Sequence, residues 1–327
     1  MARISHRNSK ETDSVPAFAG DVPPLASVEQ MIWHAQRAHH VGDDPLATTP
    51  PKPSALRVAI LRALHQLLDA PLVFEDPLAL TILGAEGEAF LRRDASRCEV
   101  PRLKRFRASL VLRGRIAEDQ WALEHHRGVR QYVILGAGLD TFAYRNSDHG
   151  RCRVFEVDLP AAIRWKRECL RMAGIQEPDS LTFVPTDLER ASLAEALRQA
   201  GFDAHAPAFF SCLGVTMYLD EEAVMRTLRF VGSLSPGSGI VFDYAVHPNF
   251  LSAREQEVME RLDKRMDESG EPWKTHLEPP SFTKTLRTLG FTNVDDYGPE
   301  ELNARYMSGR TDGLCKGGIT GIVYASV

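Results

Sequence analysis

The stretch Gln131 to Arg145, QYVILGAGLDTFAYR, decides the fold of this chain of 327 residues. Its apolar run Tyr132–Leu135 is typical of a buried strand, and Gly136 and Gly138 follow at once. Two glycines permit positive φ angles and let a ligand approach bare backbone that a side chain would cover. In an open parallel sheet, ligands bind beyond the carboxyl ends of the strands. The stretch therefore predicts the first strand of such a sheet and a ligand-binding turn after it.

Downstream of this turn, apolar runs of strand length alternate with amphipathic helical segments. This alternation is typical of an α/β fold with a doubly wound, mostly parallel sheet. The closing segments predict a helix and then an antiparallel hairpin. The predicted strands are Tyr132–Leu135, Arg153–Val157, Leu181–Val184, Ala208–Leu213, Gly239–Asp243, Phe291–Tyr297 and Gly318–Val327, and the predicted helices are Thr141–Arg145, Ala161–Ala173, Leu193–Gly201, Glu221–Leu234 and Ser281–Leu289.

The rest of the chain predicts three further regions. Residues 1–25 are polar and predict a disordered tail, and residues 26–128 predict a helical N-terminal region. Within that region Ser54 is expected to cap a helix after a proline-rich break, and another helix is expected over Leu110–His126. The core is expected over residues 129–327. Its insertion at about 247–280 predicts a helix over Ser252–Ser269, which is either a lid over the ligand edge or a surface helix without that role.

Composition excludes several function classes. The formal net charge is −5 and basic residues are dispersed among acidic ones, so we expect no nucleic-acid and no membrane partner. The five cysteines are widely spaced and form no CxxC pair, which favours buried free thiols over disulfides or a metal site. No apolar run is long enough to cross a membrane, and the N-terminus lacks a secretory pattern. We therefore expect a cytoplasmic protein without a metal.

Acidic residues near the carboxyl ends of the first three predicted strands indicate the ligand. The turn GAGLD lacks the third glycine of a dinucleotide fingerprint, and Asp140 would repel a diphosphate. Asp158, twenty residues beyond Gly138, could accept hydrogen bonds from ribose hydroxyls, and by spacing alone Glu156 could do the same. Asp187 could accept from an adenine amino group. Each acid could instead cap a helix, but three at successive strand ends favour an adenosyl ligand.

Four blocks of the sequence resemble the leucine carboxyl methyltransferase-like family. The four blocks are residues 131–145, FEVDLP at 155–160, PTDL at 185–188 and GVTMYLDEEAV at 214–224. In addition, the upstream segment VAILRALHQLLDAPLVFEDPLAL at 58–80 resembles the family's N-terminal helices. The resemblance covers roughly residues 54–327. It implies a class I, Rossmann-like methyltransferase fold and S-adenosylmethionine as cofactor.

The resemblance also implies a role for individual residues. Arg113 matches the arginine that binds the methionine carboxylate, although Arg115 lies close enough in sequence to take that place. The remaining implied contacts are Gly136 and Gly138 with the methionine portion, Asp158 with the ribose, and Asp187 and Leu188 with the adenine.

The methyl acceptor is less well defined than the cofactor. Leu213 stands where other branches of the family carry a glutamate that faces the cofactor, which makes the protein-repair branch a poor model for the substrate. We expect O-methylation of a carboxylate or hydroxyl on a small molecule, such as a secondary metabolite. A hydroxyl acceptor requires a base. Tyr218 and His247 are candidate catalytic residues, and His276 is a further one, each with packing or surface exposure as the alternative.

Two other functions fit the same fold. An NAD-dependent oxidoreductase would use the same sheet, but the missing third glycine argues against it. A catalytically inactive cofactor-binding protein is compatible with Leu213. The sequence predicts no oligomeric state.

Overall fold

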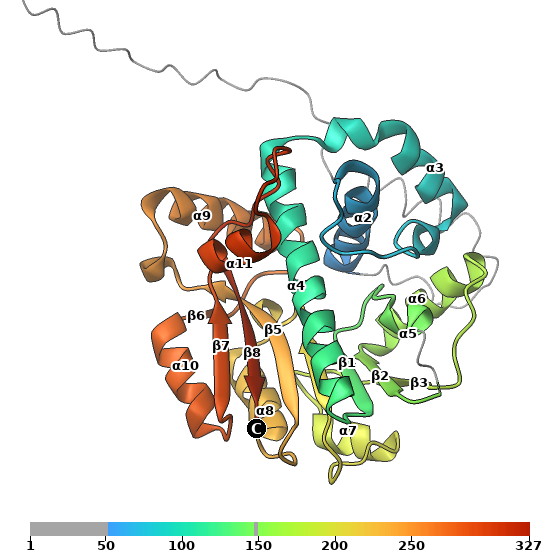
Figure 1. Cartoon of the computed structure of the whole chain (residues 1–327), viewed down its shortest axis with the longest axis vertical. Coiled ribbons are helices and arrows are strands. Elements are labelled where there is room, and N and C mark those ends of the chain that lie inside the picture. The colour runs from blue at the N-terminus through green and yellow to red at the C-terminus, as the bar shows by residue number, and fades with distance from the viewer. Residues whose placement is uncertain (1–51, 147–149) are drawn as a thin grey trace, which may run out of the picture.

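A mixed sheet of eight strands forms the centre of the molecule in a computed structural model, which describes residues 52–146 and 150–327 (Figure 1). The strand order is β3-β2-β1-β4-β5-β8-β7, and β6 pairs with the end of β5. All pairings are parallel except those of β8 with β5 and β7. The strands are β1 (Gln131–Leu135), β2 (Arg153–Asp158), β3 (Leu181–Pro185), β4 (Phe209–Cys212), β5 (Gly239–Val246), β6 (His276–Leu277), β7 (Asn293–Tyr297) and β8 (Thr320–Ser326).

Helices cover both faces and one end of this sheet (Figure 1). The described residues upstream of β1 form helices and loops only. The α-helices are α2 (Pro53–Leu68), α3 (Gly84–Asp94), α4 (Pro101–His126), α5 (Phe142–Arg145), α6 (Pro160–Met172), α7 (Leu193–Gln199), α8 (Glu221–Gly232), α9 (Ala253–Glu268), α10 (Pro279–Thr288) and α11 (Pro299–Tyr306). The 3₁₀ turns are η2 (Thr81–Leu83), η3 (Ala95–Cys98), η4 (Thr216–Tyr218) and η5 (Pro248–Phe250).

The predicted α/β fold is confirmed, including the five parallel strands and the terminal antiparallel hairpin. Two local predictions are wrong. Helix α4 begins at Pro101 instead of Leu110, because the arginine-rich first turns hide the apolar period of the helix. Ser54 is not the N-cap of α2, since Pro53 takes the first helical position. Helix α11 and the two-residue β6 had no clear sequence signal. The predicted tail and the first part of the predicted helical region, residues 26–51, lie outside the described residues.

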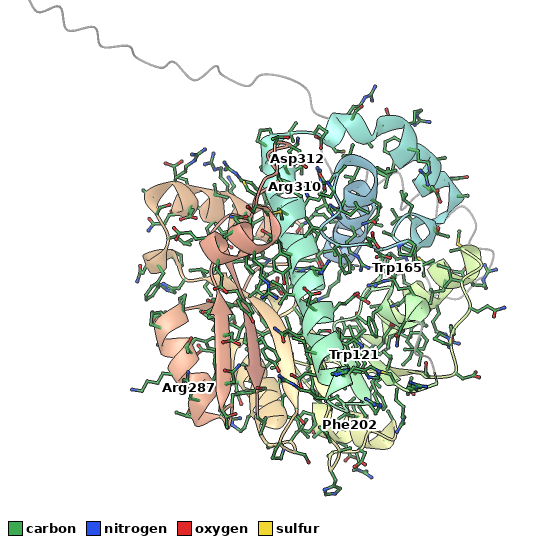
Figure 2. The ribbon with its side chains drawn as sticks, in the orientation of Figure 1. Trp121, Trp165, Phe202, Arg287, Arg310 and Asp312 are labelled. Carbon is green, nitrogen blue, oxygen red and sulfur yellow. The ribbon has the colours of Figure 1, made fainter. Side chains whose placement is uncertain are left out.

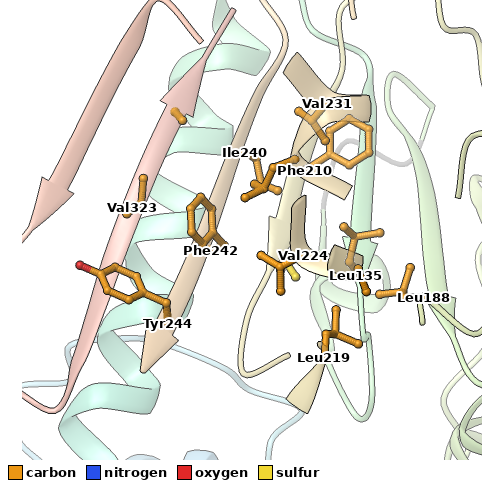
Figure 3. Packing of buried hydrophobic residues seen from close by; sticks show 14 of the residues in the cluster. Leu135, Leu188, Phe210, Leu219, Val224, Val231, Ile240, Phe242, Tyr244 and Val323 are labelled. Atoms are coloured by element: carbon orange, nitrogen blue, oxygen red, sulfur yellow. The ribbon is translucent and has the colours of Figure 1, made fainter. Parts of the chain in front are cut away.

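Alternate side chains of each strand pack on opposite faces, as a pleated strand requires. Val133 and Leu135 of β1 join the core under α7, α8 and α10, part of which Figure 3 shows. Tyr132 and Ile134 join the opposite core, which α4 covers. There Trp121 of α4 stacks on Tyr132 with ring centroids 5.0 Å apart, and Figure 2 places Trp121 over the strands. Helix α4 is therefore an integral layer of the sheet's packing.

Three further properties bear on function. All five cysteines are free thiols, four of them buried and Cys315 partly exposed. Within residues 52–146 and 150–327, no group of three or more His, Cys, Asp or Glu side chains is placed to hold a metal ion. The same residues include no helix with the length and apolar character needed to cross a membrane.

Candidate active site

A cavity of about 1440 Å³ lies beyond the carboxyl ends of β1 to β5. Its floor includes the glycine turn after β1 and the residues that follow β2, β3 and β4. Its walls come from α2, α4, α9 and the loop 315–320, which precedes and enters β8. This position is where open parallel sheets bind their ligands, as the sequence predicted.

The glycine turn has the predicted backbone conformation. Gly136 has a φ of +66° and Gly138 a φ of +45°, which side-chain-bearing residues rarely adopt. A Cβ atom at Gly136 would lie 2.3 Å from Cγ2 of Val215. Both glycines line the cavity, so the turn offers bare backbone to whatever binds there.

The structure separates the two acids of β2. The Asp158 carboxylate accepts hydrogen bonds from the backbone N–H of Gly138 (2.8 Å) and of Leu159 (2.7 Å), and Asp158 lines the cavity. Burial raises the pKa of Asp158, although these two N–H groups act to lower it. Glu156 is fully buried, does not line the cavity, and forms an ion pair with Lys166 at 2.6 Å. Asp158 alone of the two can therefore meet a ligand in this cavity.

The segment after β3 provides further lining residues. Asp187 accepts a hydrogen bond from the N–H of Glu189 at 3.0 Å, which shapes the turn, and its side chain stays partly exposed. Leu188 lines the cavity with its side chain buried against the core. The Oγ1 of Thr186 is buried and has no hydrogen-bond partner among the described residues. An unpaired hydroxyl in a cavity wall is available to a ligand.

Arg113 of α4 reaches the cavity floor. Its Nη1 lies 2.8 Å from Oδ2 of Asp243 on β5, and the other oxygen of Asp243 accepts from the N–H of Gly214. Gly214 has a φ of +71°, and a Cβ atom there would lie 2.6 Å from the guanidinium, so glycine makes room for Arg113. Arg115 does not line the cavity and instead pairs with Asp119. The geometry thus favours Arg113 over Arg115 as a ligand-binding residue.

The candidate catalytic residues have different positions. Tyr218 lines the cavity beside Trp273, with ring centroids 6.4 Å apart, and burial raises the pKa of its hydroxyl. His247 lies outside the lining, where its ring accepts from the N–H of Asn249 at 3.3 Å. His276 also lies outside and pairs with Asp263 at 3.3 Å. Of these three candidates, only Tyr218 lines the cavity.

Sequence reasoning missed several lining residues. Asp243 is the last residue of the predicted strand Gly239–Asp243 and lines the cavity. The strand-end pattern that indicated Asp158 could therefore have indicated Asp243 as well. Lys316 lies in an irregular loop with no periodic signal, and burial lowers its pKa to about 8. Arg62 of α2 lies 3.6 Å from Asp140, so Asp140 is not an isolated negative charge and would repel a diphosphate less than its sequence context alone suggests.

Comparisons with known proteins identify the family of this chain. A family model described as leucine carboxyl methyltransferase matches residues 55–232, more than half of the chain. A Bacillus subtilis protein named "Putative S-adenosyl-L-methionine-dependent methyltransferase YktD" is 31% identical over 80% of this chain and 93% of its own length. A Mycolicibacterium vanbaalenii protein with the same designation is 32% identical over 75% of this chain and 81% of its own.

A crystal structure titled "putative methyltransferase" from Thermobifida fusca aligns with 82% of this chain and 93% of its own, at 17% identity and a TM-score of 0.49. That likeness is distant, so the assignment rests on the family model and on the sequence relatives. The chain belongs to the leucine carboxyl methyltransferase family.

Proposed function

We propose that this chain is an S-adenosylmethionine-dependent methyltransferase that methylates an oxygen, a carboxylate or a hydroxyl, of a small-molecule acceptor. The observation that carries the proposal is the Asp158 carboxylate, held by the N–H of Gly138 beside the open glycine turn. This arrangement joins an acceptor for ribose hydroxyls to a backbone surface on one wall of a large cavity. The names of the relatives support the same cofactor.

The residues at the carboxyl ends of β1, β2 and β3, which are neighbours in the sheet, fit the methionine, ribose and adenine parts of this cofactor in that order. Asp158 would accept from the ribose hydroxyls, and Asp187 and Leu188 after β3 would hold the adenine. The unpaired Oγ1 of Thr186 lies in the same segment. Arg113 would bind the methionine carboxylate, because its pairing with Asp243 uses only part of a guanidinium that carries five N–H donors.

S-adenosylmethionine held by these residues would supply a methyl group on a sulfonium, with the neutral thioether S-adenosylhomocysteine as the leaving group. The residues of the chain align the acceptor and exclude water, and such alignment lowers a barrier by several kcal/mol. A carboxylate acceptor needs no base. For a hydroxyl acceptor, Lys316 is suited to accept the proton, because burial brings its pKa to about 8. Tyr218, whose pKa is raised, would act as a neutral hydrogen-bond donor.

The two alternative functions make different predictions for ligand binding. A dinucleotide-dependent oxidoreductase would bind NAD in this cavity, and a catalytically inactive protein would bind the cofactor without transferring its methyl group. Melting temperatures with S-adenosylmethionine, S-adenosylhomocysteine and NAD test the first alternative. A ligand at 100 times its Kd stabilises the folded state by about 2.7 kcal/mol. Stabilisation by NAD alone would exclude the proposed function.

Substitution of Asp158 tests the proposed site. We expect Asp158→Ala to weaken S-adenosylhomocysteine binding by about 1–3 kcal/mol in calorimetry, because buried ribose hydroxyls lose their acceptor. Asp179→Ala is the matched control, since Asp179 is exposed and lies outside the lining. Glu156→Gln should destabilise the fold through the lost Lys166 pair and leave ligand affinity unchanged. Loss of binding in Glu156→Gln but not in Asp158→Ala would contradict the assignment.

A further inference from the structure

Helix α9 separates its charges between its two sides. The helix carries more acids than bases, yet three of its four cationic side chains line the cavity: Arg254, Arg261 and Arg265. Four of its six acids lie outside the lining: Glu260, Asp263, Asp267 and Glu268. A helix that is merely solvated has no reason to sort its charges in this way. The cavity side of α9 is therefore basic although the helix is acidic as a whole.

The two acids of α9 that do line the cavity are already bonded. Glu255 accepts from the N–H and the hydroxyl of Ser252, and also from the N–H of Gly318 at 3.1 Å. Glu257 lies 3.3 Å from Arg261, and both side chains are about 70% exposed (70% and 72%). A pair so exposed contributes little to stability, so Arg261 can readily bind another anion in place of Glu257. Arg254 makes no hydrogen bond or ion pair with any residue that the structure describes.

The first turns of α4 add to the same charge. Arg102 and Arg105 line the cavity, are exposed, and form no side-chain hydrogen bond or ion pair within the described ranges. They lie on the face of α4 that carries Arg113, but nearer its beginning. Since Arg113 is nearly buried at the floor while these two are exposed, they belong to the mouth of the cavity.

Apolar side chains lie between the basic ones. Val258, Leu262 and Met266 recur on the cavity side of α9 at helical spacing. Val258 is 36% exposed, and it is one of four large apolar side chains that are exposed among the described residues. A wall of this kind suits a ligand that has both an apolar body and a negative charge.

We propose that the methyl acceptor is an amphiphilic anion, whose acidic group remains at the cavity mouth against Arg254 and Arg261 while another oxygen takes the methyl. The inference rests on the proposed function and deepens it by naming the acceptor class. The acidic group is a carboxylate, sulfonate or phosphate, which guanidinium groups bind through paired N–H donors. The apolar body lies along Val258 and Leu262.

Two fluorescent probes of similar shape and different charge test the acceptor class. Anilinonaphthalene sulfonate is an apolar anion, and N-phenylnaphthylamine is its neutral counterpart. Each is titrated into the full-length protein saturated with S-adenosylhomocysteine, so that the cofactor part of the cavity is filled. The variants are Arg254→Gln, Arg261→Gln and the double variant. Lys264→Gln is the matched control, because Lys264 lies on the same helix outside the lining.

We expect each single arginine variant to bind the anionic probe about three- to ten-fold more weakly, and the double variant about ten- to thirty-fold more weakly. Lys264→Gln should bind the anionic probe like the unmodified chain, and no variant should change the affinity for the neutral probe. Equal affinity of all variants for the anion, equal losses in Lys264→Gln, or no binding of the anion by the unmodified chain would overturn the inference. Calorimetry with S-adenosylmethionine on the same proteins tests the proposed function separately, since the arginines at the mouth should not affect that binding.

Discussion

Lys316 is a buried ammonium beside three acids that are all bonded elsewhere. Asp243 binds Arg113, and Glu255 binds Ser252. Asp296 accepts from the hydroxyl of Tyr244 at 2.8 Å. The Nζ of Lys316 donates only to neutral oxygens of the described chain: the carbonyls of Gly317 and Thr320, with the Thr320 hydroxyl at 3.5 Å. The cost of burying the charge outweighs the attraction of the acids, and the pKa of Lys316 falls from 10.5 to about 8.

This lysine should give the protein a rise in stability with pH. Below pH 8 both the folded and the unfolded chain carry the proton, and the cost of burying it is fully present. Between pH 8 and about 10 the folded chain loses the proton first, so the unfolded state binds more protons and stability increases. We expect urea unfolding free energies to rise by about 2 kcal/mol more in the unmodified chain than in Lys316→Met between pH 7.5 and 9.5. Parallel pH curves for the two proteins would show that Lys316 is not buried as an ammonium.

At the scale of the element, α9 is fixed at its ends and loosely held between them. Ser252 and Glu255 form a capping box at its beginning. After its end, Glu271 accepts from the backbone N–H (2.8 Å) and the hydroxyl (2.7 Å) of Ser54 in the first turn of α2. Only Met259 and Met266 of the helix are buried. An element with few buried contacts and two fixed ends is suited to open and close over a ligand, as the predicted lid would.

If α9 acts as the predicted lid, the contact between Glu271 and Ser54 should control how often it opens. We expect Glu271→Ala to speed hydrogen exchange of the amides in residues 266–273 by about ten- to a hundred-fold. The reason is that the buried carboxylate of Glu271 and its two hydrogen bonds are lost. Exchange in β1 should not change. Glu268→Ala, at the exposed last residue of α9, is the control. Equal exchange in both variants would mean that this contact does not hold α9 closed.

At the scale of the whole molecule, the helices upstream of β1 share a core with the sheet. Ala108, Val111, Leu112, Ile116 and Trp121 of α4 belong to the same buried cluster as strand residues of β1, β4, β5 and β8. The sequence predicted a boundary near residue 128. A boundary in composition does not require a boundary in packing, because a helix can contribute one layer to a neighbouring sheet.

Removal of this layer should therefore prevent folding. We expect a fragment of residues 129–327 to show no cooperative thermal transition by circular dichroism, since one face of the sheet would be exposed to water. The chain from residue 52 onward should melt cooperatively. A fragment 129–327 that melts cooperatively near the temperature of the longer chain would show that the core folds without α4.

The sequence by itself determined the sheet, the glycine turn and the strand ends that carry acids. These features depend on local periodicity and on fixed spacing along the chain, which a fold of this class preserves. Spacing along the chain could not choose between Glu156 and Asp158, because alternation places both on one face, and only the family resemblance favoured Asp158.

The tertiary structure decided those questions through contacts between residues distant in sequence. Glu156 forms an ion pair with Lys166, and Asp158 is oriented by the N–H of Gly138. Arg113 forms an ion pair with Asp243, which lies 130 positions away in the sequence. The basic side of α9 likewise became visible only when the cavity showed which residues of the helix face it. Which charged groups are paired and which remain open to a ligand depends on three-dimensional proximity, and no local pattern in the sequence encodes it.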